Sequence, residues 1–171
     1  MSNKNRWSSP NRVENITGIT LHAARLGETA VLTELIDRGA DVNVQDEKGY
    51  TPLIIACYNN RYDAAALLLR HGADVNAADF GGNTALMGVA FKGYPDIARL
   101  LLMHGADLDR QHGNGGTALM FAVLFGRNEV MRLLLESGAD PLIPDSRGLT
   151  AYDIAIQQGN QEATLLLGQE A

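Results

Sequence analysis

Histidine and cysteine side chains are the first groups in this sequence to consider as metal ligands or nucleophiles. The four histidines are His22, His71, His104 and His112, and Cys57 is the single cysteine. No His-x-x-x-His, Cys-x-x-Cys or Gly-x-x-x-x-Gly-Lys motif occurs. These are patterns that hold zinc, carry thiol redox chemistry or cradle a phosphate. We therefore expect no catalytic residue, no metal and no cofactor.

Cys57 closes the apolar segment 53–57. A single cysteine cannot form a disulfide within the chain, so stability must come from packing. A cysteine in an apolar run is usually a small buried core residue, and we prefer that interpretation to a reactive nucleophile.

A period of 33 residues organises the chain and positions these groups. Gly-Ala-Asp begins at Gly39, Gly72, Gly105 and Gly138. Three further series keep the same step. The first is Gly49, Gly82, Gly115 and Gly148, and the second is Thr51, Thr84, Thr117 and Thr150. The third is Gly27, Asn60, Gly93, Gly126 and Gly159. Landmarks in one register over nearly the whole chain indicate an internal repeat.

Each landmark predicts a helix boundary. A threonine hydroxyl can accept a hydrogen bond from an unpaired amide at a helix start, and Pro52 is tolerated at the first helical position. About nine residues later, a glycine or Asn60 supplies the left-handed residue that ends this first helix. A second helix then carries three consecutive leucines, which predict cover on more than one side. The leucine triplets are residues 67–69, 100–102, 133–135 and 165–167.

The segments between Gly-Ala-Asp and the next threonine are rich in Asn, Asp and Gly, which predicts projecting turns. Each unit is thus a turn and a helical hairpin, and only neighbouring units can bury its apolar face. The sequence predicts an all-α solenoid of five units, approximately residues 13–45, 46–78, 79–111, 112–144 and 145–171. Residues 1–12 form an N-terminal arm, in which Trp7 either packs on the first unit or acts as a binding hook.

These motifs make the sequence similar to the ankyrin repeat family. The family run Gly-x-Thr-Pro-Leu-His-x-Ala-Ala is matched best by residues 49–57, and Gly-Ala-Asp-Val-Asn occurs in full at residues 39–43 and 72–76. The resemblance covers roughly residues 13–167 and implies an ankyrin-repeat solenoid of helix-turn-helix units.

The departures from the family pattern fall in the first helices, at the ends and in the last turns. Gly18 replaces the first threonine, and Leu108-Asp109 and Pro141-Leu142 replace Val-Asn. Departures in the terminal units are expected of capping repeats, because their outer faces meet water. The family histidine of the first helix is replaced throughout, by Leu21, Ile54, Met87, Met120 and Asp153.

The repeat also explains the histidines and carboxylates that recur with it. His71 and His104 occupy the same place in adjacent units, where equivalent atoms lie roughly 8–10 Å apart. Two ligands of one zinc must each lie about 2.0–2.1 Å from the ion, so these two cannot share one. Both end a second helix, where the helix dipole favours a cation. We interpret the aspartate of each Gly-Ala-Asp as a turn residue and not as part of an acid/base pair.

Composition limits the classes of partner. The 171 residues carry a net charge of −6 at pH 7. This acidity argues against a nucleic-acid groove, which needs clustered Lys and Arg, and no apolar run approaches the roughly 20 residues of a membrane helix. The first ten residues lack the apolar core of a secretory signal. We therefore expect a cytoplasmic monomer that binds neither nucleic acid nor membrane.

By resemblance to ankyrin proteins, partner contacts fall on the turns and on the two residues before the helix-ending glycine. Five of the nine Phe and Tyr residues occupy such positions, and aromatic side chains are enriched in binding hot spots. We expect them to line the concave face as a partly exposed ladder. The candidate protein-binding residues are Tyr50, Tyr58, Phe80, Phe91, Lys92, Leu124 and Phe125. In the alternative interpretation, large side chains here only cover the adjoining helix.

Tyr62 and Tyr94 belong to the starts of second helices, and we interpret them as packing residues. The resulting hypothesis is a protein–protein interaction module, an adaptor, scaffold or inhibitor. The chain also resembles short bacterial ankyrin proteins, some of which accompany catalases. That resemblance implies an alternative, an accessory or chaperone-like protein that protects a partner enzyme such as a catalase.

Overall fold

The structure is a computed structural model that describes residues 10–168, with side chains from residue 15 onward. The chain forms two compact units, Met1–Asp74 and Val75–Ala171. Ten helices and no strand occur in the described residues, which confirms the prediction of an all-α fold.

The first unit contains α1 (Pro10–Leu26), α2 (Thr29–Asp37), α3 (Pro52–Tyr58) and α4 (Tyr62–Arg70). Helix α1 packs against α2 and α3, and α2 and α3 both pack against α4. Helix α1 begins three residues before the expected boundary at residue 13, and Gly18 lies inside it and not at its start. Trp7 lies outside the described residues.

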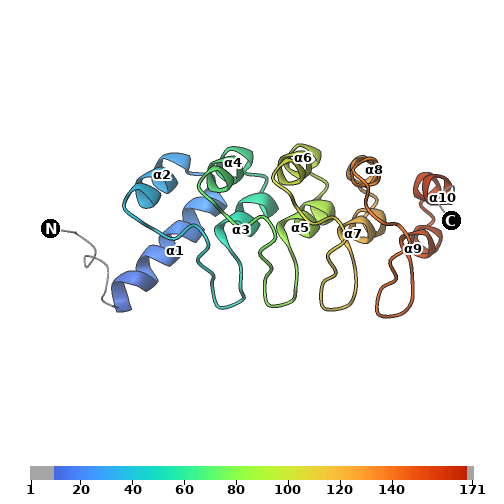
Figure 1. The fold of residues 1–171 in the computed structure, drawn as a ribbon, viewed down its shortest axis with the longest axis horizontal. Helices are drawn as coiled ribbons and strands as arrows, with labels where there is room; N and C mark the ends of the chain where they lie inside the picture. The colour runs from blue at the N-terminus through green and yellow to red at the C-terminus, as the bar shows by residue number, and fades with distance from the viewer. Residues whose placement is uncertain (1–9, 169–171) are drawn as a thin grey trace. The chain divides into compact units, whose positions relative to one another are not determined.

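The second unit contains three helical hairpins, whose first helices are α5 (Ala85–Lys92), α7 (Ala118–Leu124) and α9 (Ala151–Gln158). The second helices are α6 (Pro95–Met103), α8 (Asn128–Glu136) and α10 (Gln161–Leu167). Within this unit the first helices form one row and the second helices another, and the turns project beyond the row of first helices (Figure 1).

The threonine series starts the first helices as the sequence predicts. The side chains of Thr51, Thr84, Thr117 and Thr150 each accept a hydrogen bond from the backbone N–H three residues later. Helix α9 adds a reciprocal bond, because the Asp153 carboxylate accepts the backbone N–H of Thr150 at 2.9 Å. Aspartate at the position of the family histidine therefore reinforces the helix start.

The predicted left-handed residues end the first helices. Asn60 has a φ of 56° and is the one non-glycine with positive φ in the described part of the chain. Gly93 has a φ of 83°, and a Cβ there would lie 2.7 Å from Cδ of Arg127. The missing side chain lets Arg127 cross the end of α5, where its Nε donates to the carbonyl oxygen of Phe91 at 3.0 Å.

The core of the second unit lies between its two rows of helices. Leu101 of α6 and Leu134 of α8 are completely buried, and Leu86 and Leu119 of the first helices are buried as well. The last leucine triplet departs from this pattern because it is shifted by one residue. Leu165 stands 33 residues after Arg132, a surface position, and is 70% exposed. The prediction that a leucine triplet marks a helix covered on more than one side therefore fails at Leu165.

Side chains between Gly-Ala-Asp and the turns connect successive hairpins. Asn76 donates from Nδ2 to the carbonyl oxygen of Gly105 at 3.2 Å and accepts the backbone N–H of Asp107 at 2.8 Å. Asp109 replaces the asparagine one repeat later and still accepts the N–H of Asp140 at 2.8 Å. The departure at residues 108–109 thus keeps the accepting half of the contact.

The turns of the second unit are themselves joined at their tips. The N–H of Gly113 donates to the carbonyl oxygen of Gly81, and the N–H of Ser146 donates to that of Asn114, both at 3.0 Å. Gly115 lies so close to the next turn that a Cβ would be 2.7 Å from the backbone nitrogen of Ser146. The turns 79–83, 112–116 and 145–149 therefore stack backbone against backbone.

Candidate protein-binding surface

The C-terminal ends of α5 and α7 bring two predicted aromatic residues together. The rings of Phe91 and Phe125 meet edge to face, with centroids 4.4 Å apart and an interplanar angle of 69°. Phe125, the residue that caps α7, is 40% exposed, Leu124 before it is also exposed, and Phe91 is half-buried. We call Phe91, Leu124 and Phe125 the ring surface.

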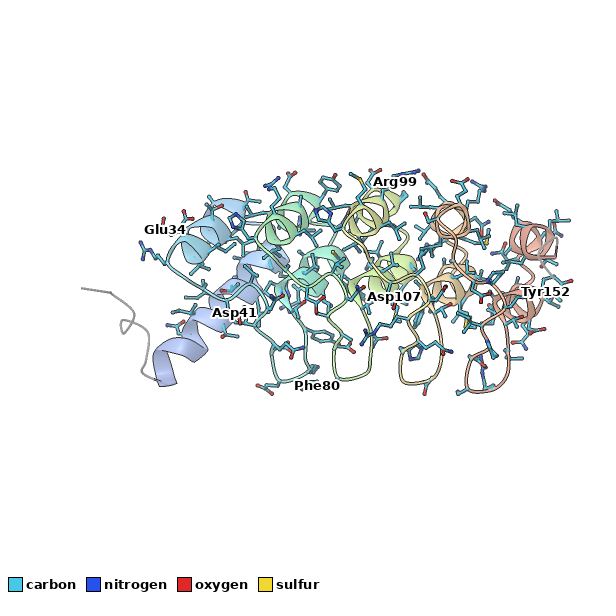
Figure 2. All side chains as sticks on the ribbon, in the orientation of Figure 1. Glu34, Asp41, Phe80, Arg99, Asp107 and Tyr152 are labelled. Carbon is cyan, nitrogen blue, oxygen red and sulfur yellow. The ribbon has the colours of Figure 1, made fainter. Side chains whose placement is uncertain are left out.

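The other predicted residues lie at the ends of α3 and α5 and in the turns before these two helices. Tyr50 and Tyr58 belong to the first unit, where Tyr58 is exposed at the end of α3 and Tyr50 is half-buried. Lys92, the last residue of α5, is half-buried. Phe80 is 74% exposed at the tip of a turn (Figure 2). Within the second unit, Phe91 and Phe125 are two predicted residues whose rings are in contact.

A groove adjoins the ring surface in the second unit. It has a volume of about 350 Å³, and Leu124 belongs to both features. Phe121 and Met120 of α7 and Ile154 of α9 supply apolar walls, and the turns 112–116 and 145–149 supply polar ones. Phe121 is half-buried and Ile154 is buried, so both could be predicted only as core residues from the apolar helix segments in which they lie.

Three of the turns are closed by an aspartate and one by a histidine. The Oδ1 atoms of Asp46, Asp79 and Asp145 each accept the backbone N–H groups two and four residues later, at 2.8–3.0 Å. His112 occupies this place in the turn before α7, and its Nδ1 accepts the N–H of Asn114 at 3.0 Å. Its ring also packs against Phe121, with centroids 5.1 Å apart. The sequence did contain a signal for this site, since histidine replaces aspartate in one register position.

The carboxylate of Asp145 is fully engaged inside its own turn. Oδ2 accepts hydrogen bonds from Nε and Nη2 of Arg147 at 3.0 and 2.8 Å. These bonds, and after them the bond from the backbone of Leu149, lower the pKa of Asp145 below its ordinary value of 3.8. Hydrogen bonds from the backbone and then the side chain of Thr150 similarly lower the pKa of Asp153.

Cys57 is completely buried in α3, as the sequence predicts. Burial raises the pKa of its thiol well above the ordinary value, so the thiolate that a nucleophile requires is disfavoured. His71 and His104 follow the last residues of α4 and α6, as expected. The interpretation of Tyr62 as a packing residue is wrong, because Tyr62 is exposed at the first position of α4, whereas Tyr94 is half-buried.

Residues 10–168 contain no group of three or more His, Cys, Asp or Glu side chains placed to hold a metal ion. None of their helices combines the length and apolar character that crossing a membrane requires.

Comparison with known proteins identifies the repeat. A family model described as ankyrin repeats in three copies matches residues 20–112 and again residues 86–171. No curated protein matches the chain significantly. Ankyrin repeats are generally protein–protein interaction modules and typically lack enzymatic activity. The two matches together cover residues 20–171, and the chain belongs to the ankyrin repeat family.

Proposed function

We propose that this protein is an adaptor, scaffold or inhibitor whose second unit binds a partner protein through the ring surface. The observation that carries the proposal is the edge-to-face pair of Phe91 and Phe125 beside the exposed Leu124. Aromatic residues dominate binding hot spots because each buries a large area with few rotatable bonds.

The rings are held in place before any partner arrives. The edge-to-face contact orients each ring against the other, and Arg127 ties the end of α5 through the carbonyl oxygen of Phe91. A surface fixed in advance loses little conformational entropy on binding, so more of the contact energy appears as affinity.

The alternative is that Phe125 serves only to cover Phe91. The two roles have different consequences, because truncating a core residue lowers stability whereas truncating an interface residue lowers affinity. We expect Phe125→Ala and Phe91→Ala each to change the free energy of unfolding by less than about 1 kcal/mol. Each should weaken partner binding by about 2 kcal/mol, which is roughly 30-fold.

The experiment is affinity capture with the full chain, followed by measurement of the dissociation constant for the captured partner. Met103→Ala is the matched control, because Met103 is an exposed apolar residue of the same unit at the end of α6. Loss of about 3 kcal/mol of stability in both ring variants, with unchanged affinity of the folded fraction, would show that the rings are core. The partner's identity distinguishes an adaptor, scaffold or inhibitor from an accessory protein, since a protected enzyme such as a catalase would favour the accessory function.

A further inference from the structure

We infer that the groove beside the ring surface recognises an acidic segment of the partner protein, with one bulky apolar side chain in the groove and a neighbouring carboxylate at its rim. This inference rests on the proposed function and specifies the chemistry of the partner. It follows from the shape of the groove and from the histidine that replaces a turn aspartate. It also follows from Asp145, the one carboxylate that lines the groove, because its oxygens are already occupied by hydrogen bonds within their own turn.

The apolar part of the groove suits a large side chain. Phe121 and Leu124 lie one helical turn apart on α7, and Ile154 comes from the neighbouring α9. The volume of about 350 Å³ lies at the small end of the range for ligand pockets, which fits one or two side chains better than a folded element. Leu124 makes the groove continuous with the ring surface, so the same partner would cover both.

His112 offers the groove a hydrogen-bond donor where aspartate would offer acceptors. Because Nδ1 accepts the N–H of Asn114, the proton of the neutral ring is on Nε2. Nε2 lies on the side of Gly116, since a Cβ on that glycine would be 2.9 Å from it, and Gly116 lines the groove. The ring stays in place because its other edge is held by the turn and its face packs on Phe121.

The facing turn also presents a donor. Asp145 is the one carboxylate among the groove-lining residues, and its side chain is only 8% exposed because four hydrogen bonds occupy it. Its partner Arg147 is 65% exposed, and a guanidinium has five N–H groups, of which Asp145 uses two. A ligand therefore meets the N–H groups of Arg147 and His112, and an acceptor with negative charge complements both.

A random peptide library displayed on phage and selected on the immobilised full chain provides the probe. We expect the selected peptides to carry Asp or Glu within two positions of Phe, Leu, Ile, Met or Trp. Affinity of the synthesised peptides is then measured by fluorescence anisotropy. His112→Asp restores the acceptor used by the other three turns, so it preserves the turn while it places a carboxylate in the groove. We expect this variant to weaken the selected peptides about 10-fold or more.

Three controls isolate the cause. His112→Asn keeps an acceptor for the turn without adding charge, so it should weaken binding less than His112→Asp. Arg147→Gln should weaken binding, whereas Arg99→Gln, on the surface of α6 (Figure 2), should not. Thermal unfolding of each variant establishes that the compared proteins are folded.

Selected peptides without acidic residues, or acidic peptides that bind wild type and His112→Asp equally, would overturn the inference. A library that yields no binding peptide would count against it as well. The affinity of the captured partner for two variants distinguishes failure of this inference from failure of the proposed function. If that partner loses affinity on Phe125→Ala but not on His112→Asp, the ring surface stands and the acidic segment does not.

Discussion

Helices α6 and α10 are both second helices with three consecutive leucines, but they bury them differently. In α6, Leu101 is completely buried, and the helix packs against α5 and α8. In α10 the triplet is shifted by one position, so Leu165 stands where α6 has the exposed Arg99. The position within the 33-residue period, and not the type of side chain, therefore decides which leucines stabilise the fold.

The largest expected effect is at the interior helix. Leu101→Ala removes a fully buried side chain, and the cavity should lower the free energy of unfolding by about 2–5 kcal/mol. Urea denaturation followed by circular dichroism measures this loss. A loss below about 1 kcal/mol would mean that α6 is no better packed than α10.

An intermediate effect concerns local opening. Among the described helices, α8 packs against α6, α7 and α10, whereas α10 packs mainly against α8 and α9. Repeats are stabilised by their neighbours, so the least-covered helix should open most often. We expect amides of α10 to be protected from hydrogen exchange at least about 10-fold less than those of α8, which corresponds to about 1.4 kcal/mol. Equal protection of the two helices would contradict the comparison.

The smallest effect is expected at the shifted leucine. Leu165→Arg places in α10 the residue type that α6 and α8 have at this position, and it should change stability by no more than about 0.5 kcal/mol. Leu167→Arg in the same triplet is the matched contrast, because Leu167 is buried and a charge there would be desolvated. Thermal melts of the two variants should differ clearly, and similar melts would show that register does not govern burial here.

The sequence predicted the backbone well because its signals are local. Thr84 and Gly93 each act within a few residues, through a hydroxyl that accepts a nearby N–H and through a left-handed φ. Side-chain exposure was harder to predict because it depends on neighbours that the period alone does not specify. Phe121 belongs to an apolar helix segment, and only the turn that stands over it makes it the wall of a groove.

The candidate surface was predicted in part for the same reason. Phe125 and Leu124 were found because they precede a helix-ending glycine, a position that usually faces outward. His112 was seen only as a histidine without a metal motif, since its role depends on a hydrogen bond to Asn114 and a packed ring. Its signal in the sequence is the register, because the three equivalent turns have aspartate at this position.

The stacked turns of the second unit also restrict how this sequence can change in length. Surface loops usually tolerate insertions at little cost, but the tip of turn 112–116 is bonded on one side to Gly81 and on the other to Ser146. An inserted residue at this tip would displace hydrogen bonds to both neighbouring turns, and Gly115 leaves no space for a bulge toward the next one. Here the gain or loss of a complete 33-residue unit preserves the contacts, so duplication and deletion of whole units is the form of length variation that this architecture permits.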